Sequence, residues 1–110
     1  MDCLFCKMVS GEIPVKRLHD DDVAIAFADI HPQAPVHVLV VPKVHVQSVA
    51  EATDQAMLGG LMAAAASVAK AQGLQNGFRL VLNTGEDGGQ TVGHLHVHVL
   101  GGRPMNWPPG

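Results

Sequence analysis

The chain has 110 residues, of which 47% are hydrophobic and 15% charged, and its formal net charge is −3. This length suits one small domain with a core of its own, and the lack of a basic stripe argues against a nucleic-acid partner. No apolar run reaches the roughly 18 residues that a membrane span needs, and the start lacks the basic residues of a signal peptide, so we expect a cytoplasmic protein with no membrane partner.

The first part of the chain predicts a short helix followed by strands. Asp2 is a helix-capping residue type, and a helix is expected over 3–10, where Gly11 ends it. Strands are expected over 15–18 and 23–29, joined by a polar turn at 19–22. A loop with two prolines follows at 30–35. The apolar run at 36–41 then predicts a strand that Pro42 ends.

The second part predicts one long helix and two more strands. Thr53 opens the helix, which is expected over 54–72 from apolar residues at helical spacing and which Gly73 ends. Gly59 and Gly60 weaken its intrinsic propensity by roughly 1 kcal/mol each, which indicates close packing there. Strands are expected over 78–83 and 92–100, before an irregular tail at 103–110. We therefore expect an α+β fold, a single domain over 1–110 with an antiparallel sheet of about five strands.

Three histidines alternate with apolar residues in the run HLHVHVL at positions 94–100. Side chains in a strand alternate between its two faces, so His94, His96 and His98 are expected on one face and the apolar residues on the other. The preceding segment, 85–93, is rich in glycine, which lets a backbone approach a ligand closely. This pattern indicates a functional site at the strand.

Three interpretations of the histidine strand remain open from spacing alone. The histidines could be incidental residues of a half-exposed strand. Two of them could hold zinc together with His45 and activate a water molecule. In the third interpretation, His96 is a nucleophile that attacks phosphorus, His98 is a neighbouring donor, and the glycine-rich loop at 88–91 holds the phosphate oxygens.

The run HLHVHVL matches the histidine-triad signature, in which histidines alternate with apolar residues. The similarity extends to six further segments, which together cover nearly the whole chain in order: DIHPQAPVH at 29–37, VPKVH at 41–45, NTG at 83–85, GGQ at 88–90, GGRP at 101–104 and WPPG at 107–110. The chain therefore resembles the HINT branch of the histidine-triad (HIT) superfamily, the histidine triad nucleotide-binding proteins.

This resemblance implies a HIT-like fold whose sheet continues across a homodimer. It also implies a phosphoramidase that cleaves the P–N bond of purine nucleoside phosphoramidates derived from AMP or GMP, with no cofactor required for catalysis. By motif position, His96 becomes nucleotidylated, His98 contacts the phosphate and the leaving group, and His94 and His45 orient His96. The implied nucleotide-binding residues are Asp29 at the ribose; Asn83, Gly89, Gln90 and Thr91 around the phosphate; Leu4, Phe5, Met8, Phe27 and Ile30 around the base; and Trp107 in the tail.

Two other functions stand beside this expectation. One is a dinucleoside polyphosphate hydrolase of the sister branch, against which the WPPG tail argues. The other is a nucleotide- or zinc-binding adaptor whose turnover is incidental. The remaining histidines, His19, His31 and His37, are interpreted as structural or surface residues.

Cys3 and Cys6 form a Cys-x-x-Cys pair at the start of the first predicted helix. Two cysteines do not make a disulfide scaffold, and a zinc half-site needs two more ligands. Some bacterial relatives with this pair bind a structural zinc, completed by the histidines that correspond to His45 and His94. The resemblance thus implies a zinc site of Cys3, Cys6, His45 and His94; the alternative is free thiols beside two hydrogen-bonded histidines.

Overall fold

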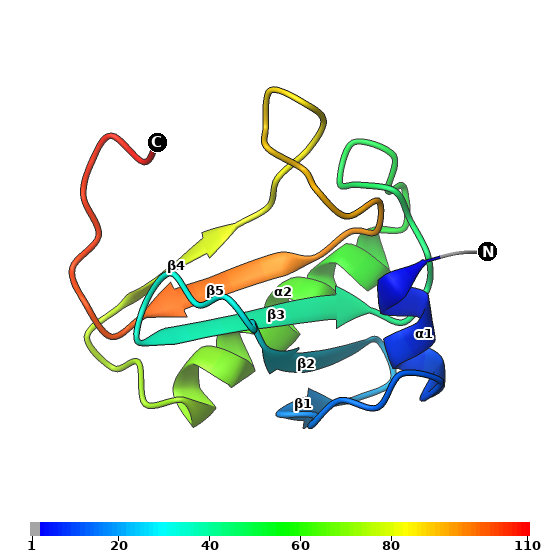
Figure 1. The fold of residues 1–110 in the computed structure, drawn as a ribbon, viewed down its shortest axis with the longest axis horizontal. Coiled ribbons are helices and arrows are strands. Elements are labelled where there is room, and N and C mark those ends of the chain that lie inside the picture. The colour runs from blue at the N-terminus through cyan, green and yellow to red at the C-terminus, as the bar shows by residue number, and fades with distance from the viewer. Residues whose placement is uncertain (1–2) are drawn as a thin grey trace.

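Five antiparallel strands form one sheet, with a long helix across one face and a short helix against the other (Figure 1). The structure is a computed structural model that describes residues 3–110. The strands are β1 (His19–Asp20), β2 (Ala24–Ala28), β3 (Val36–Pro42), β4 (Phe78–Val81) and β5 (Val97–Gly101), in the spatial order β1-β2-β3-β5-β4. The helices are α1 (Leu4–Ser10) and α2 (Gln55–Ala71). The predicted α+β class is confirmed.

Apart from His37, β2 and β3 are apolar along their whole length, because both faces of the sheet are covered. Ala24 and Ala26 of β2, with Val38 and Val40 of β3, pack in one cluster against the buried residues of α2. The alternate residues form a second cluster with Phe5 of α1: Ile25, Phe27, Leu39 and Val41. Successive residues of a strand point to opposite faces of the sheet, so alternate residues of β2 and β3 belong to two different cores.

The helix starts differ from the predictions by one residue each. Cys3 is the N-cap of α1, and its Sγ accepts the backbone N–H of Cys6 at 3.3 Å. The predicted cap, Asp2, lies outside the described residues. Asp54, rather than Thr53, caps α2, because its Oδ1 accepts the N–H of Met57 at 3.1 Å. None of the helices in residues 3–110 combines the length and apolar character required to cross a bilayer.

The first predicted strand is wrong in position. β1 lies at His19–Asp20, inside the segment predicted as a turn, while residues 15–18 form no strand. The turn is tighter than expected, since Oδ1 of Asp21 accepts the N–H groups of both Val23 and Ala24. This local side-chain bond closes the hairpin directly after Asp20 and lets residues before His19 leave the sheet.

The last two strands are shorter than predicted. β4 ends at Val81 rather than at residue 83, and β5 begins at Val97 rather than at residue 92. The ladder between β3 and β5 stops at the pair Val40↔Val97. Pro42 at the end of β3 has no N–H to donate, and Leu95 instead donates its N–H to Val46 O at 2.7 Å. The segment with His94 and His96 is thus an extended continuation of β5 outside the ladder.

Candidate functional site

The predicted separation of the histidines from the apolar residues holds although the strand is shorter. Leu95, Val97 and Val99 belong to the cluster that packs on α2. His94 and His96 lie on the opposite side, where the ring of Phe5 meets theirs edge-on at centroid distances of 5.9 and 5.2 Å. Both imidazoles are almost completely buried, so their hydrogen bonds rather than bulk water determine their state.

His96 has one ring nitrogen fixed by the backbone. Its Nδ1 lies 2.8 Å from the carbonyl oxygen of His94, and a carbonyl only accepts, so Nδ1 carries the proton. Within residues 3–110, Nε2 of His96 has no hydrogen-bond partner. Neutral His96 therefore holds its lone pair at Nε2, which is the state a nucleophilic imidazole requires.

His98 is fixed in the opposite tautomer through His37. The backbone N–H of Gln33 donates to Nδ1 of His37 at 3.0 Å, so the proton of a neutral His37 sits on Nε2. That N–H lies 2.9 Å from Nδ1 of His98, which must accept it. His98 therefore carries its own proton at Nε2 and presents a hydrogen-bond donor.

Burial keeps His98 neutral as well. The pKa of His98 is lowered to about 4, chiefly by removal from water and also by the neighbouring His96 and His37, while Asp29 acts in the opposite direction. The ring centroids of His96 and His98 are 5.0 Å apart. The site thus places the Nε2 side of the His96 ring beside a neutral donor.

His37, which the sequence analysis assigned a structural or surface role, lies within the candidate site in contact with His98. It is 7% exposed and connects His98 to Asp29, whose Oδ2 lies 3.3 Å from Nε2 of His37. The available signal was its place in the apolar run of β3, where an inward-facing imidazole needs partners. Asp29, His37 and His98 could suggest a metal site, but Gln33 forces Nε2 of His37 to carry a proton, which removes it as a ligand.

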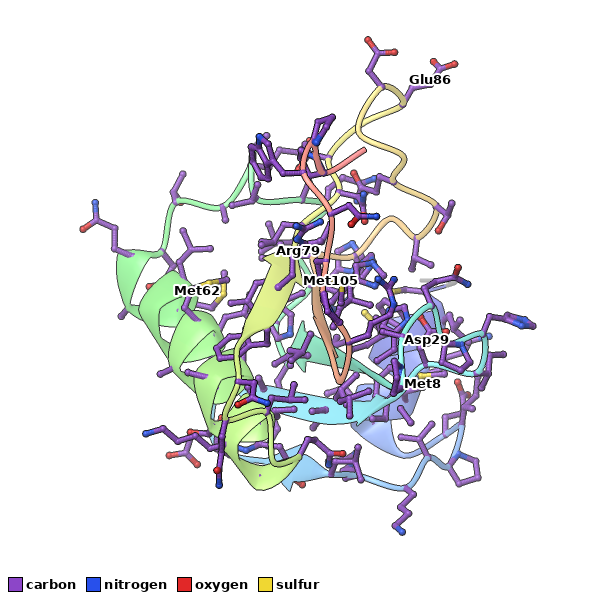
Figure 2. All side chains as sticks on the ribbon, turned by 90° about the vertical axis from the view of Figure 1, so that its left-hand side faces the viewer. Met8, Asp29, Met62, Arg79, Glu86 and Met105 are labelled. Carbon is purple, nitrogen blue, oxygen red and sulfur yellow. The ribbon has the colours of Figure 1, made fainter. Side chains whose placement is uncertain are left out.

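An apolar cavity of about 540 Å³ opens beside α1. It brings together all six residues predicted around the base and the ribose, with Thr91 from the set predicted around the phosphate: Leu4, Phe5, Met8, Phe27, Asp29, Ile30 and Thr91. Val15, Lys16, Leu18, Ala28, His31 and Val92 complete its lining. Figure 2 shows Met8 and Asp29 close together, on the side of the sheet opposite Met62 of α2. Val15–Leu18 reach this cavity because they are not part of the sheet.

The glycine-rich loop is held by two amide side chains. Asn83 donates from Nδ2 to Gly88 O at 2.7 Å, and Gln90 accepts the N–H of Gly85 at 3.0 Å. The Nε2 of Gln90 also donates to Gln47 O and Val92 O, so its whole amide is engaged within the protein. Gly89 has a φ of 77°, a conformation that favours glycine. Figure 2 shows Glu86 at the tip of this loop, away from the sheet.

The two cysteines converge with His45 and His94 into one cluster. Nδ1 of His94 lies 3.1 Å from Nδ1 of His45, 3.3 Å from Sγ of Cys3 and 3.5 Å from Sγ of Cys6. Nδ1 of His45 is also 3.3 Å from Sγ of Cys6. Nε2 of His94 is 3.0 Å from Pro42 O, so it carries the proton and leaves Nδ1 with one lone pair. His45 and the two cysteines cannot all donate a hydrogen bond to that one lone pair. A cation at the centre of the cluster could instead accept a lone pair from each of the four side chains.

The donor set and spacing fit zinc. Tetrahedral zinc with Zn–N about 2.0 Å and Zn–S about 2.3 Å separates two nitrogens by about 3.3 Å and a nitrogen from a sulfur by about 3.5 Å. The measured separations agree within a few tenths of an ångström, and all four ligand atoms lie within 4.8 Å of one another. The Pro42 carbonyl that orients His94 is typical of the support around a zinc ligand. Burial lowers the pKa of His94, which keeps it neutral and able to ligate.

Trp107 lies apart from this chain's own cavity. Its side chain is 81% exposed, and the tail that carries it runs along the end of the molecule opposite α1 (Figure 1). Arg79 of β4 holds the tail by donating to Asn106 O at 2.8 Å. Trp107 is therefore available to another molecule rather than to the cavity beside Phe5.

Comparison with known sequences identifies relatives along the whole chain. A family model described as the HIT domain matches residues 10–105. An uncharacterized HIT-like protein from Synechococcus elongatus is 50% identical over 111 residues, which cover 99% of this chain and 97% of the relative. The 14 kDa zinc-binding protein of Brassica juncea is 49% identical and covers 99% of this chain and 100% of its own length.

Solved structures agree with this assignment. A HIT family hydrolase from Legionella pneumophila superposes with a TM-score of 0.95 at 46% identity, covering 99% of this chain and 100% of that protein. The histidine triad nucleotide-binding protein from Candida albicans superposes with a TM-score of 0.84 at 29% identity, covering 97% of this chain and 83% of that protein. With a family model over most of its length and close relatives of the same size and shape, the chain belongs to the HIT family.

Proposed function

We propose that this protein is a purine nucleoside phosphoramidase of the HINT type, which hydrolyses the P–N bond of nucleotide amines. The observation that carries the proposal is the tautomer of His96. Its proton is held at Nδ1 by the His94 carbonyl, and its Nε2 lone pair lies beside the N–H donor His98 and the cavity-lining Phe5. A nucleophile, a donor and an apolar base pocket in one place suit nucleotidyl transfer.

The reaction runs in two halves. Nε2 of His96 forms a bond to phosphorus as the P–N bond breaks, and the amine takes up one proton from solvent as it leaves. Water then attacks phosphorus, the P–Nε2 bond breaks, and one proton of the water returns to solvent. His98 donates from Nε2 toward the phosphate oxygens or the leaving nitrogen in both halves.

The cavity beside α1 takes the nucleoside. Its volume of about 540 Å³ and apolar lining suit a purine between Phe5, Phe27 and Ile30, with Asp29 at the mouth for the ribose hydroxyls. Asn83, Gly89 and Thr91 supply the phosphate side, and Gln90 keeps their loop in shape. Purines are expected to bind better than pyrimidines because they bury more apolar area.

Zinc has a structural place in this proposal. Cys3, Cys6, His45 and His94 provide four ligands, which fills a tetrahedral site and leaves no position for an activated water. When bound, zinc would tie α1 to the segment that carries His94. His94 and His45 would then be ligands rather than members of a proton relay to His96. The zinc-binding relative from Brassica juncea supports this assignment.

We further propose a homodimer in the cytoplasm. Trp107, exposed on the tail, would then contribute to the leaving-group side of the partner's site. Cys3 and Cys6 are free thiols, which suits a reducing compartment and a zinc-ligating role.

The test is turnover of an adenosine phosphoramidate with a fluorescent amine, followed with and without a strong chelator. Wild-type protein should release the amine, and rapid quenching should trap one nucleotide per chain on His96. The variant His96→Asn should bind AMP with unchanged affinity and release no amine. Loss of turnover with chelator and its return with zinc, in a chain that stays folded, would instead favour a metal-activated water.

Two further outcomes separate the alternatives. A faster reaction with a dinucleoside polyphosphate than with the phosphoramidate would favour the sister branch. Tight AMP binding with no amine release from the wild type would favour an adaptor that binds nucleotide and zinc. Turnover retained by His96→Asn would contradict the proposal itself.

A further inference from the structure

His37 has one proton and two acceptors for it. Nε2 of His37 lies 2.9 Å from Nδ1 of His98 and 3.3 Å from Oδ2 of Asp29. The backbone N–H of Gln33 blocks Nδ1, so His37 cannot offer a second proton while neutral. The side chain of His37 is 4% exposed, which leaves no room for water to relieve the competition. A single N–H is therefore shared between the sugar side and the phosphate side of the site.

Asp29 is the member of this trio that ligand can reach. Its side chain is 18% exposed and lines the cavity, whereas His37 is enclosed. Oδ1 of Asp29 accepts the N–H of His31 at 2.8 Å, which fixes the carboxylate and points Oδ2 toward His37. Hydroxyl groups that donate to this carboxylate would draw its negative charge toward themselves and weaken its attraction for the His37 proton.

We propose that His37 is a positioning residue that couples a vicinal diol bound at Asp29 to the orientation of His98. The inference rests on the proposed function and extends it to the role of the sugar. With the diol bound, the His37 proton is committed to His98, which holds the His98 ring with its Nε2–H toward the phosphate. Without the diol, Asp29 competes for that proton and His98 is held less firmly.

The coupling predicts an effect on catalysis and not only on affinity. Loss of a contact that acts equally on bound substrate and transition state raises KM alone, whereas poorer placement of a catalytic donor lowers kcat. One hydrogen bond redirected in a buried site corresponds to a change of up to about tenfold. The ribose hydroxyls should therefore contribute to kcat as well as to binding.

The kinetic test compares an adenosine phosphoramidate with its 2′,3′-dideoxy counterpart, both carrying the same amine. In the wild type, kcat at saturation should fall by about tenfold without the diol, in addition to any rise in KM. His37→Met removes the donor at similar volume and should lower kcat on the ribose substrate to the dideoxy level, so that the sugars differ in KM only. His37→Gln restores an N–H near the Nε2 position and should recover part of the difference in kcat.

A spectroscopic measurement keeps the test independent of turnover. With ¹⁵N-labelled imidazoles, adenosine should shift the Nδ1 signal of His98, and 2′,3′-dideoxyadenosine at saturation should not. Equal kcat for both sugars in the wild type, a sugar effect on kcat that survives in His37→Met, or equal shifts with both nucleosides would overturn the coupling. A wild type that releases no amine from the ribose substrate would overturn the proposed function instead.

Discussion

The three histidines of the HLHVHVL run differ chemically because different backbone groups fix their protons. The Pro42 carbonyl places the proton of His94 on Nε2, and the His94 carbonyl places that of His96 on Nδ1. His98 is set indirectly, through His37 and the N–H of Gln33. Chain geometry alone thus gives one residue type the three states that the proposed function assigns to a ligand, a nucleophile and a donor.

The low pKa of His98 predicts that acid weakens the fold. A histidine in the unfolded chain takes up a proton near pH 6.5, whereas folded His98 does so only near pH 4. The contribution of His98 to the free energy of unfolding is therefore fully present above pH 6.5 and is lost as the pH falls toward 4. Because the ring is half-buried, we expect a loss of about 2 kcal/mol in the free energy of unfolding.

Urea unfolding at pH 7.5 and pH 4.5, with chelator present throughout, would measure this loss. The variant His98→Asn should show a smaller difference between the two pH values than the wild type. His31→Asn changes an exposed imidazole at the cavity and should keep the wild-type difference. Equal differences in the wild type and His98→Asn would contradict the assignment.

The element that joins the two chemical sites is α1. Its first residues hold Cys3 and Cys6 in the metal cluster, and one of its faces places Phe5 and Met8 in the wall of the cavity. The other end of α1 is also held in place, because Arg17 donates hydrogen bonds to the carbonyls of Met8 and Val9 at 3.1 and 2.9 Å. Carbonyls in the last turn of a helix attract a cation, and Met8 O also accepts the N–H of Gly11 at 3.2 Å.

Loss of the metal should therefore weaken nucleotide binding. Cys6→Ser is expected to abolish stoichiometric zinc and to raise the Kd for AMP by about tenfold, because α1 is then free to leave the cavity wall. Chelation of the wild type should have the same effect. Metal analysis and calorimetric titration with AMP would measure both.

Arg17→Met is the matched control for this prediction. It loosens the other end of α1, so AMP affinity should fall while one zinc per chain remains bound. Unchanged AMP affinity in zinc-free Cys6→Ser would show that α1 stays in place without the metal and would contradict its bridging role.

Gly59 and Gly60 of α2 are neighbours in the chain, but they differ in the space around them. A Cβ at Gly60 would lie 2.9 Å from Cγ2 of Val23, whereas a Cβ at Gly59 would meet nothing within 4 Å. Gly60→Ala should therefore cost about 1 kcal/mol of stability through this contact, and Gly59→Ala should gain up to about 1 kcal/mol from helix propensity. Urea unfolding of both variants tests the pair. A gain from Gly60→Ala would show that Val23 can move aside.

Periodicity predicted the elements but not where the hydrogen-bond ladders stop. The apolar run at 36–41 predicted β3, and alternation predicted the two faces of the histidine strand, since burial follows the two-residue period. It misplaced β1, because a local bond from Asp21 competes with pairing, and it extended β5 past the point where Pro42 ends the ladder. His37 was missed for a related reason. Its role depends on Gln33 and Asp29, which meet it only in the folded chain.

At the scale of the whole molecule, the two edges of the sheet are unlike. The edge strand β1 has two residues, and Asp20 there pairs with Arg17 and Lys43, at 2.9 and 2.8 Å. Short, charged edges resist pairing with another chain. The opposite edge, β4, has four residues, and Phe78 on it is 44% exposed. The one charged residue of this edge, Arg79, is bonded to Asn106 O, and the exposed ring of Phe78 gives a second copy an apolar surface on which to pair.

The expected dimer therefore joins β4 to β4 and continues the sheet across a twofold axis. Such an interface uses the same residues from both copies, so one charge in β4 enters the interface twice. Phe78→Glu should convert a particle of twice the chain mass of 11.6 kDa into one of 11.6 kDa. Light scattering at tens of micromolar chain would measure the mass.

The control is Ile30→Glu, which charges another exposed apolar residue, one that lines the nucleotide cavity and is 86% exposed. It should leave the mass unchanged, because β4 remains apolar. Phe78→Glu should keep its zinc and its AMP affinity, since Phe78 belongs neither to the cluster of cysteines and histidines nor to the lining of the cavity. A change in its preference among leaving amines would follow from the loss of the partner's Trp107. A wild type of single-chain mass, or a Phe78→Glu variant that stays a dimer, would show that β4 is not the contact.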